Sequence, residues 1–258
     1  MLGHEVVGAG PLGVIVLNDW ISDTSSSWGE ARRYLDEARF SWAFADVRGY
    51  GRSLDQRGAF NVTEIASDVL ALADSLGWQR FSIVGHSMTS LAALHLAQHE
   101  PRRVERAVVL TPTSPLGLGL DEATIAALQG VSRGNDEAHL GALNAMWGDR
   151  LSEGWVRFKL ARWRAASAPE AVAQYLAMFA RDGLPDRTAR IAAPVLAVAG
   201  ERDAEPMRPT QVAEFLRPLC ERLNIAPLAD VGHYPMQEAP PLLVTTIERF
   251  LQQGAAAH

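Results

Sequence analysis

The sequence predicts an α/β protein whose mostly parallel sheet is covered by helices on both faces. Short runs rich in valine, isoleucine and leucine alternate with longer segments of helical pattern. One long stretch of helical composition interrupts this alternation in the second half of the chain. With 258 residues, of which 48% are hydrophobic and 21% charged, the chain is long enough to bury a large apolar core.

Six segments are predicted to be strands because they are short, apolar and bounded by turn-forming residues. They cover residues 13–18, 40–46, 81–85, 104–111, 194–200 and 224–229. Helices are expected between and after these strands, where apolar residues repeat at helical spacing or a proline ends the pattern. They cover residues 27–38, 63–76, the segment from Met88 toward Pro101, and residues 241–252.

A helical cap is predicted where the alternation breaks. Residues 112–193 separate two consecutive strands, although a crossover connection needs only about a dozen residues. Glycine or proline stands at the joints between the helical pieces of this stretch. We therefore expect residues 1–111 and 191–258 to form the core, and residues 112–190 to form a cap of three or four helices.

The strongest chemical signal lies at the end of the strand 81–85. There the chain runs through Gly85-His86-Ser87-Met88 directly from an apolar strand into a helix. A serine at such a corner is held on a strained turn that lifts its hydroxyl clear of the sheet. The first turn of the helix also directs N–H groups at any oxyanion that forms on a substrate. Ser87 is therefore the candidate nucleophile.

A serine hydroxyl needs a base to take its proton, and the base needs a partner to orient it. Asp203 follows the strand 194–200, and His233 follows the strand 224–229. Both are expected at the edge of the sheet where the carboxyl ends of the strands meet and ligands bind. Glu201, two residues before Asp203, is the runner-up for the acid.

Four motifs in this order resemble those of the α/β-hydrolase superfamily, and the resemblance covers nearly the whole chain. The motifs are DVRGYGRS from residue 46, GHSM from residue 85, GERD from residue 200 and GHYPMQEAP from residue 232. The resemblance implies Ser87 as nucleophile, His233 as general base and later general acid, and Asp203 as the carboxylate that orients the imidazole. In the first motif, Asp46 and Arg48 are expected to hold the loop rather than to react.

Two departures from the family pattern stand close to the expected site. Thr89 occupies a position where many relatives have glycine, and its bulk is expected to open the elbow slightly. Relatives often carry His-Gly after the strand 13–18, whereas this chain has Asn18-Asp19-Trp20. By position, the backbone N–H groups of Trp20 and Met88 would form the oxyanion hole.

Asp19 is an unusual neighbour for an oxyanion. A carboxylate there opposes the developing charge unless it points away or holds the loop by hydrogen bonds. Asp19, Trp147 and Tyr234 are the candidate substrate-binding residues. Large apolar side chains of the cap either line an acyl pocket or form the cap's own core, and we expect a few of them to face the pocket. This set comprises Met146, Trp147, Trp155, Phe158, Trp163, Tyr175, Met178 and Phe179.

Three weaker patterns are interpreted as structural. The run GAGPLG from residue 8 has the spacing of a dinucleotide fingerprint, but a strand follows it where that motif requires a helix. His95 and His99 are spaced as metal ligands on a helix, but no third ligand accompanies them. His86 is expected to pack rather than to react. We therefore expect no metal and no organic cofactor.

Composition argues against several classes of partner. The net charge of −6 provides no positive field for nucleic acid, and no apolar run approaches the roughly 20 residues that span a bilayer. The N-terminus does not resemble a secretion signal, and Cys220 is the only cysteine, so no internal disulfide can form. We expect a cytoplasmic monomer or homodimer whose partner is a small-molecule substrate.

The expected activity is hydrolysis of a small to medium apolar ester or lactone through an acyl-enzyme. A serine at the elbow, rather than an aspartate, argues against haloalkane dehalogenase and epoxide hydrolase chemistry. Hydrolysis of a carbon–carbon bond and perhydrolase activity remain alternatives, because relatives perform them with similar residues. A ligand receptor with little turnover is a further alternative, suggested by Asn18-Asp19-Trp20.

Overall fold

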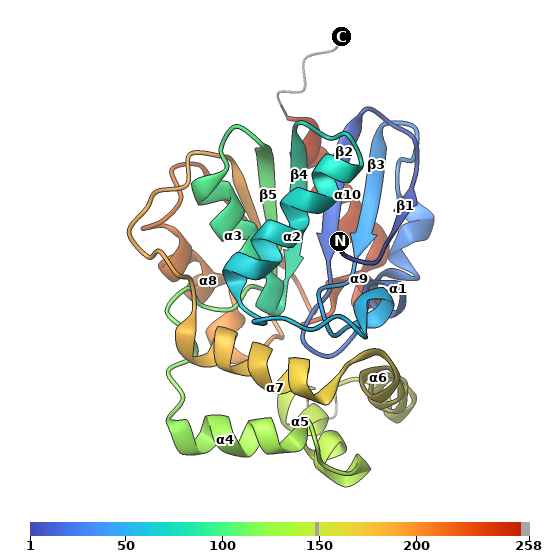
Figure 1. Ribbon diagram of the computed structural model, residues 1–258, viewed down its shortest axis with the longest axis vertical. Coiled ribbons are helices and arrows are strands. Elements are labelled where there is room, and N and C mark those ends of the chain that lie inside the picture. The colour runs from blue at the N-terminus through green and yellow to red at the C-terminus, as the bar shows by residue number, and fades with distance from the viewer. Residues whose placement is uncertain (148–149, 254–258) are drawn as a thin grey trace.

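A seven-stranded sheet forms the centre of the molecule (Figure 1). The structure, a computed structural model, describes residues 1–147 and 150–253, with only the backbone described for residues 145–147. The strands are β1 (His4–Val7), β2 (Leu12–Leu17), β3 (Phe40–Ala45), β4 (Phe81–His86), β5 (Val104–Leu110), β6 (Val195–Gly200) and β7 (Leu223–Leu228). Their order across the sheet is β1-β3-β2-β4-β5-β6-β7. β1 runs antiparallel to β3, and the other neighbours are parallel.

The six predicted strands are confirmed as β2 to β7. Central strands such as β4 and β6 are buried along their whole length, which explains their continuous apolar runs. β1 was not among the predicted strands because it is a short, partly exposed edge strand that contains His4 and Glu5. The run GAGPLG joins β1 to β2, so it connects two strands as expected.

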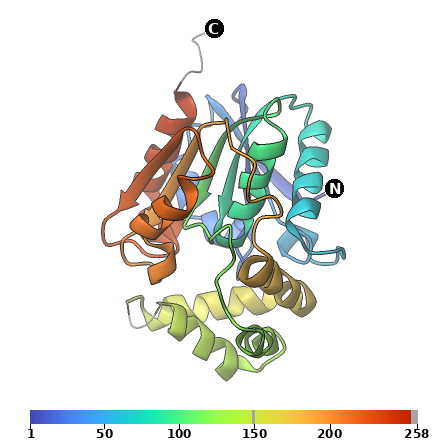
Figure 2. The same cartoon turned by 90° about the vertical axis from the view of Figure 1, so that its left-hand side faces the viewer.

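Helices cover both faces of the sheet. α2 and α3 lie on one face, and α8 and α10 lie on the other (Figure 2). The helices outside the cap are α1 (Thr24–Trp28), α2 (Val62–Ser75), α3 (Ser90–His99), α8 (Pro209–Leu216), α9 (Pro235–Glu238) and α10 (Pro240–Gln252). In the described residues, no helix is both long enough and apolar enough to cross a membrane.

The prediction of one helix over residues 27–38 is wrong. The segment instead contains α1, which begins at Thr24, and a separate 3-10 turn, η1 (Ala31–Tyr34). α1 begins early because the Asp23 side chain caps it by accepting a hydrogen bond from the Ser26 N–H. It ends at Trp28, which is buried against Phe44 of β3.

The helical insertion lies between β5 and β6 in the chain. Its helices are α4 (Glu122–Val131), α5 (Asp136–Trp147), α6 (Glu153–Ala166) and α7 (Pro169–Ala177). These helices lie together beyond one end of the strands (Figure 1). Trp20, from the loop after β2, packs against Trp163 of α6 and Phe179, with ring centroids 5.3 and 5.5 Å apart. The insertion therefore covers the edge of the sheet at which β2 and β4 end.

Candidate active site

Ser87 lies on a sharp turn between β4 and α3. Its φ of 53° is in the left-handed region, which costs energy for a residue with a side chain. The turn is possible because Gly85 has no Cβ: such an atom would lie 2.5 Å from the carbonyl oxygen of Thr89. The carbonyl of Ser87 accepts a hydrogen bond of 2.5 Å from the Ser90 hydroxyl. The sequence pattern thus folds locally as the strained elbow that was predicted.

Thr89 makes hydrogen bonds on both sides of this turn. Its Oγ1 accepts a hydrogen bond of 3.0 Å from the His86 N–H and donates one of 2.8 Å to the carbonyl of Asn18. The side chain is completely buried. The elbow therefore accommodates the bulky residue, because the hydroxyl finds partners on both sides.

Asp203 and His233 meet at the same edge of the sheet. The Nδ1 of His233 lies 2.9 and 3.1 Å from the two carboxylate oxygens of Asp203, and both side chains are buried. Burial by itself lowers the pKa of His233, but the charge and hydrogen bond of Asp203 outweigh burial and raise that pKa. Glu201, the runner-up for the acid, is exposed. The geometry therefore pairs the imidazole with Asp203.

Hydrogen bonds from the ends of β4 and β5 and from α9 hold the backbone around His233. The Nε2 of His86 donates a hydrogen bond of 2.8 Å to its carbonyl, and the Thr111 hydroxyl donates one of 3.2 Å. The Glu238 carboxylate accepts hydrogen bonds from the N–H groups on either side, those of Gly232 and Tyr234. His86 thus packs, as predicted, but it also fixes the histidine loop. Sequence reasoning missed this role because the two residues are 147 positions apart.

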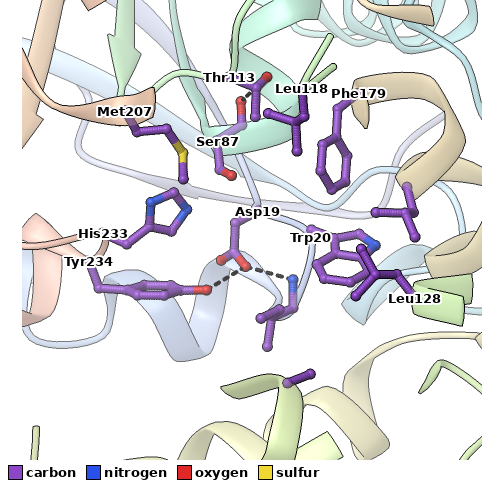
Figure 3. Close-up of a pocket in the computed structure, with 13 residues that line it drawn as sticks. Asp19, Trp20, Ser87, Thr113, Leu118, Leu128, Phe179, Met207, His233 and Tyr234 are labelled. Atoms are coloured by element: carbon purple, nitrogen blue, oxygen red, sulfur yellow. Dashed lines mark hydrogen bonds between the residues drawn. The ribbon is translucent and has the colours of Figure 1, made fainter. Parts of the chain in front are cut away.

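Ser87 and His233 line one cavity of about 250 Å³. In Figure 3 the Ser87 hydroxyl and the His233 ring lie on the same wall. Most other described side chains of the wall are apolar: Trp20, Ile21, Leu118, Leu128, Ala142, Leu176, Phe179 and Met207. Thr113, Asp19 and Tyr234 complete it, and none of the described wall residues is a lysine or arginine.

Asp19 is the centre of a hydrogen-bond network in the loop after β2. Its Oδ1 accepts bonds of 2.7 and 3.1 Å from the Ile21 and Ser22 N–H groups and one of 2.8 Å from the Tyr234 hydroxyl (Figure 3). Its Oδ2 accepts one of 3.0 Å from the Ser27 hydroxyl. The carboxylate therefore holds the loop by hydrogen bonds, which is one of the two arrangements that remove its conflict with an oxyanion.

The charge of Asp19 is stabilised although the group is fully buried. Burial acts to raise the pKa of its carboxyl, but the Lys159 ammonium, His86 and the loop N–H groups outweigh burial. They hold the pKa well below its usual range, so Asp19 is ionised at neutral pH. Sequence reasoning did not assign Lys159 to the site, because only the three-dimensional fold brings α6 to this loop.

The residues that flank the expected oxyanion hole are firmly held. The indole Nε1 of Trp20 donates a hydrogen bond of 2.8 Å to the carbonyl of Val172, and the carbonyl of Trp20 accepts one of 2.6 Å from the Tyr50 hydroxyl. Met88 is completely buried in the 3-10 turn Ser87–Thr89, which precedes α3. Trp20 lines the same cavity as Ser87.

The large side chains of the cap have different environments: one lines the cavity, and others pack against neighbouring residues or are exposed. Phe179 lines the cavity. Trp163 and Tyr175 are buried in packing contacts, and Trp155 lies against Tyr234 with ring centroids 5.5 Å apart. Phe158 is among the exposed large hydrophobic residues. The side chains of Met146 and Trp147 lie outside the described part of the structure.

Asp46 and Arg48 hold the segment after β3 by hydrogen bonds, as expected from the sequence. The Asp46 carboxylate accepts hydrogen bonds from the backbone N–H groups of Thr24 and Arg52. The Arg48 guanidinium donates two hydrogen bonds, of 2.7 and 2.8 Å, to the Asp68 carboxylate. Within the described residues, no cluster of three histidine, cysteine or acidic side chains has the arrangement of a metal site.

Comparisons with known proteins agree with this architecture. Residues 14–240 match the family described as alpha/beta hydrolase fold. A pimeloyl-[acyl-carrier protein] methyl ester esterase of Nitrosospira multiformis is 26% identical, over 95% of this chain and 96% of that protein. A 3-oxoadipate enol-lactonase of Acinetobacter baylyi is 22% identical, over 98% of this chain and 93% of that protein.

Solved structures give the same result for the fold. The crystal structure of a bromoperoxidase from Bacillus anthracis superposes with a TM-score of 0.83 at 20% identity, covering 96% of this chain and 94% of that one. At this identity the likeness concerns the fold alone. The family match, which spans most of the chain, establishes that this protein belongs to the alpha/beta hydrolase fold family and is a hydrolase of that fold.

Proposed function

We propose that the protein is a serine hydrolase that cleaves a small to medium apolar ester or lactone through an acyl-enzyme. The observation that carries the proposal is the buried His233–Asp203 pair, because its imidazole lines the same cavity as Ser87, which is held on a strained elbow. The esterase and the enol-lactonase among the relatives support an ester or lactone as the reactive group. The apolar wall and the volume of about 250 Å³ support a substrate of modest size.

In this mechanism the Ser87 Oγ attacks the carbonyl carbon while the Nε2 of His233 takes the hydroxyl proton. Asp203 holds the imidazole in orientation and stabilises its positive charge. The N–H groups of Trp20 and Met88 would bind the oxyanion of the tetrahedral intermediate. When that intermediate collapses, the carbon–oxygen bond of the substrate breaks and the leaving alcohol takes the proton from His233.

The acyl group then remains bound to Ser87 as an ester. A water molecule, deprotonated by His233, attacks this ester and releases the carboxylic acid, while the proton returns to the serine oxygen. With a lactone, the alcohol and the acid are parts of one product molecule. Asp19, which lines the cavity and is bonded to Tyr234, is assigned to holding the pocket wall rather than to proton transfer.

The proposal is tested with a panel of aryl esters, alkyl esters and lactones. Ser87→Ala is expected to lose at least about a thousandfold in kcat for every ester or lactone that the wild type cleaves. Ser67→Ala is the matched control, because Ser67 is an exposed serine on α2. Undiminished turnover by folded Ser87→Ala would contradict the proposal.

A further inference from the structure

Lys159 is the single lysine of the sequence, and it is buried. It lies on α6 of the cap, and its ammonium donates a hydrogen bond to the hydroxyl of Ser22 in the loop after β2. The same nitrogen lies 3.6 Å from the centre of the Tyr234 ring, within the range of a cation–π contact. A buried lysine without such partners is strongly unfavourable, so this environment stabilises a charge.

The partners in these two contacts of Lys159 both bind one carboxylate oxygen. The Ser22 N–H and the Tyr234 hydroxyl each donate a hydrogen bond to the Oδ1 of Asp19, at 3.1 and 2.8 Å. Burial lowers the pKa of Lys159 to about 8, against the opposing effects of Asp19 and Asp23. At neutral pH Lys159 is therefore mainly charged beside an ionised Asp19.

Ser22 and Lys159 have the residue types of a serine–lysine dyad, but neither can reach a substrate in this arrangement. Both side chains are completely buried, and neither is part of the described wall of the cavity. Ser22 and Lys159 can therefore affect a reaction only indirectly, by their contacts with Asp19 and with the loop that contains Trp20. Asp19 lines the cavity together with Ser87.

We propose that Lys159 is a positioning residue of the oxyanion hole, which balances the buried charge of Asp19 and holds the loop that presents the Trp20 N–H. This inference rests on the proposed function. It means that a residue of the cap contributes to the electrostatics of the active site. An uncompensated carboxylate beside the cavity opposes the negative charge of the tetrahedral intermediate. The ammonium cancels much of that field and leaves the hydrogen bonds of Asp19 to the loop intact.

The remaining contacts of α6 support this role for the cap. Arg162 forms an ion pair of 2.9 Å with Asp23, four residues after Asp19 in the chain. Trp163 packs on Trp20 at 5.3 Å between ring centroids. Three side chains of one helix thus contact the loop after β2, so correct seating of α6 and correct placement of the Trp20 N–H are linked.

The test compares five variants in steady-state hydrolysis of one aryl ester, and one of them is the single variant Asp19→Asn, which measures the loss of the carboxylate charge alone. Lys159→Met removes the charge at similar length, and Lys159→Gln removes it but keeps a hydrogen-bond donor for Ser22. The double variant Lys159→Met/Asp19→Asn removes both charges and keeps an acceptor oxygen for the loop N–H groups. Arg157→Met is the matched control, because Arg157 lies on α6 in an exposed ion pair with Glu153. Thermal unfolding confirms that each variant is folded.

Lys159→Met is expected to lower kcat by about tenfold to a hundredfold with little change in KM, since the effect falls on the transition state. The double variant is expected to recover part of that kcat, because no uncompensated charge remains. Arg157→Met should resemble the wild type. If Lys159→Met does not fold, Lys159→Gln and the double variant provide the same comparison.

Two results would overturn the inference. One is a kcat of folded Lys159→Met or Lys159→Gln equal to that of Arg157→Met. The other is a double variant whose loss is the product of the two single losses, which indicates that Lys159 only packs. Ser87→Ala separates this failure from failure of the proposed function: if Ser87→Ala is inactive while Lys159→Met is fully active, only the role of Lys159 is wrong.

Discussion

The Thr89 hydroxyl donates a hydrogen bond of 2.8 Å to the carbonyl of Asn18, and it thereby joins the nucleophile turn to the loop after β2. The two residues are 71 positions apart, yet they link the two segments that would supply the oxyanion N–H groups. A side chain at the elbow thus ties the segment that contains Met88 to the segment that contains Trp20.

Thr89→Val tests this link, because valine has the shape of threonine without its hydroxyl. We expect kcat to fall by about tenfold to a hundredfold, since small misplacements of catalytic groups have effects of this size. Thr89→Ser, which keeps the hydroxyl, should stay close to the wild type in steady-state assays. Equal rates for the two variants would show that the Thr89 hydroxyl does not contribute to kcat.

The pH dependence of kcat/KM is expected to follow the ionisation of the His233 imidazole. Only the neutral imidazole can take a proton, so kcat/KM should fall as the pH falls through the pKa of His233. Burial lowers that pKa, but the Asp203 carboxylate outweighs burial and raises it above its ordinary value of about 6.5. The midpoint of the acidic limb is therefore expected above pH 6.5.

Asp203→Asn should move this limb to lower pH, because the carboxylate that raises the pKa is gone. It should also lower kcat by about ten thousandfold, the loss typical of removing the acid of a triad. Glu201→Gln is the control, because Glu201 is exposed and should leave both quantities unchanged. The reverse pattern would assign the acid to Glu201.

Gly85 is expected to be essential for stability as well as for the elbow. In Gly85→Ala the new Cβ would lie 2.5 Å from the Thr89 carbonyl oxygen, and such overpacking costs about 1 to 3 kcal/mol. Gly130→Ala, on α4, meets no atom within 4 Å and is expected to gain up to about 1 kcal/mol. Urea unfolding of the two variants measures both effects, and equal stabilities would argue against a strained elbow.

The cavity is expected to favour substrates with a neutral acyl group over those with an anionic one. Its described residues include the Asp19 carboxylate but no lysine or arginine, so an anionic acyl group would be buried without a partner. A 4-nitrophenyl ester of hexanoic acid should have a kcat/KM at least about tenfold above that of the adipic acid monoester. A preference for the monoester would show that a cation reaches the pocket.

Much of the fold and the serine elbow of the candidate site follow from local sequence patterns. Buried parallel strands require continuous apolar runs, so β2 to β7 were predictable, and the strand–serine–helix corner at Ser87 has a local signature. The helix expected over 27–38 was wrong because Asp23 starts the helix earlier than the apolar pattern suggests.

Other features depend on contacts that no local pattern encodes. His86 bonds to the carbonyl of His233 across 147 positions, and Lys159 bonds to Ser22 across 137. The sequence suggested that Asp19 holds its loop by hydrogen bonds or points away, but it could not name the partners, because Tyr234 and Lys159 come from the end of the chain and from the cap. Such networks become visible only when the tertiary structure brings these segments together.

The most direct test of the account is the covalent reaction of Ser87 with a fluorophosphonate, followed by mass spectrometry of the peptides. We predict one adduct per chain, located on Ser87, formed in parallel with the loss of ester hydrolysis and absent in Ser87→Ala. A folded wild-type protein in which Ser87 stays unmodified, or in which ester hydrolysis continues after Ser87 is fully labelled, would contradict the proposed mechanism.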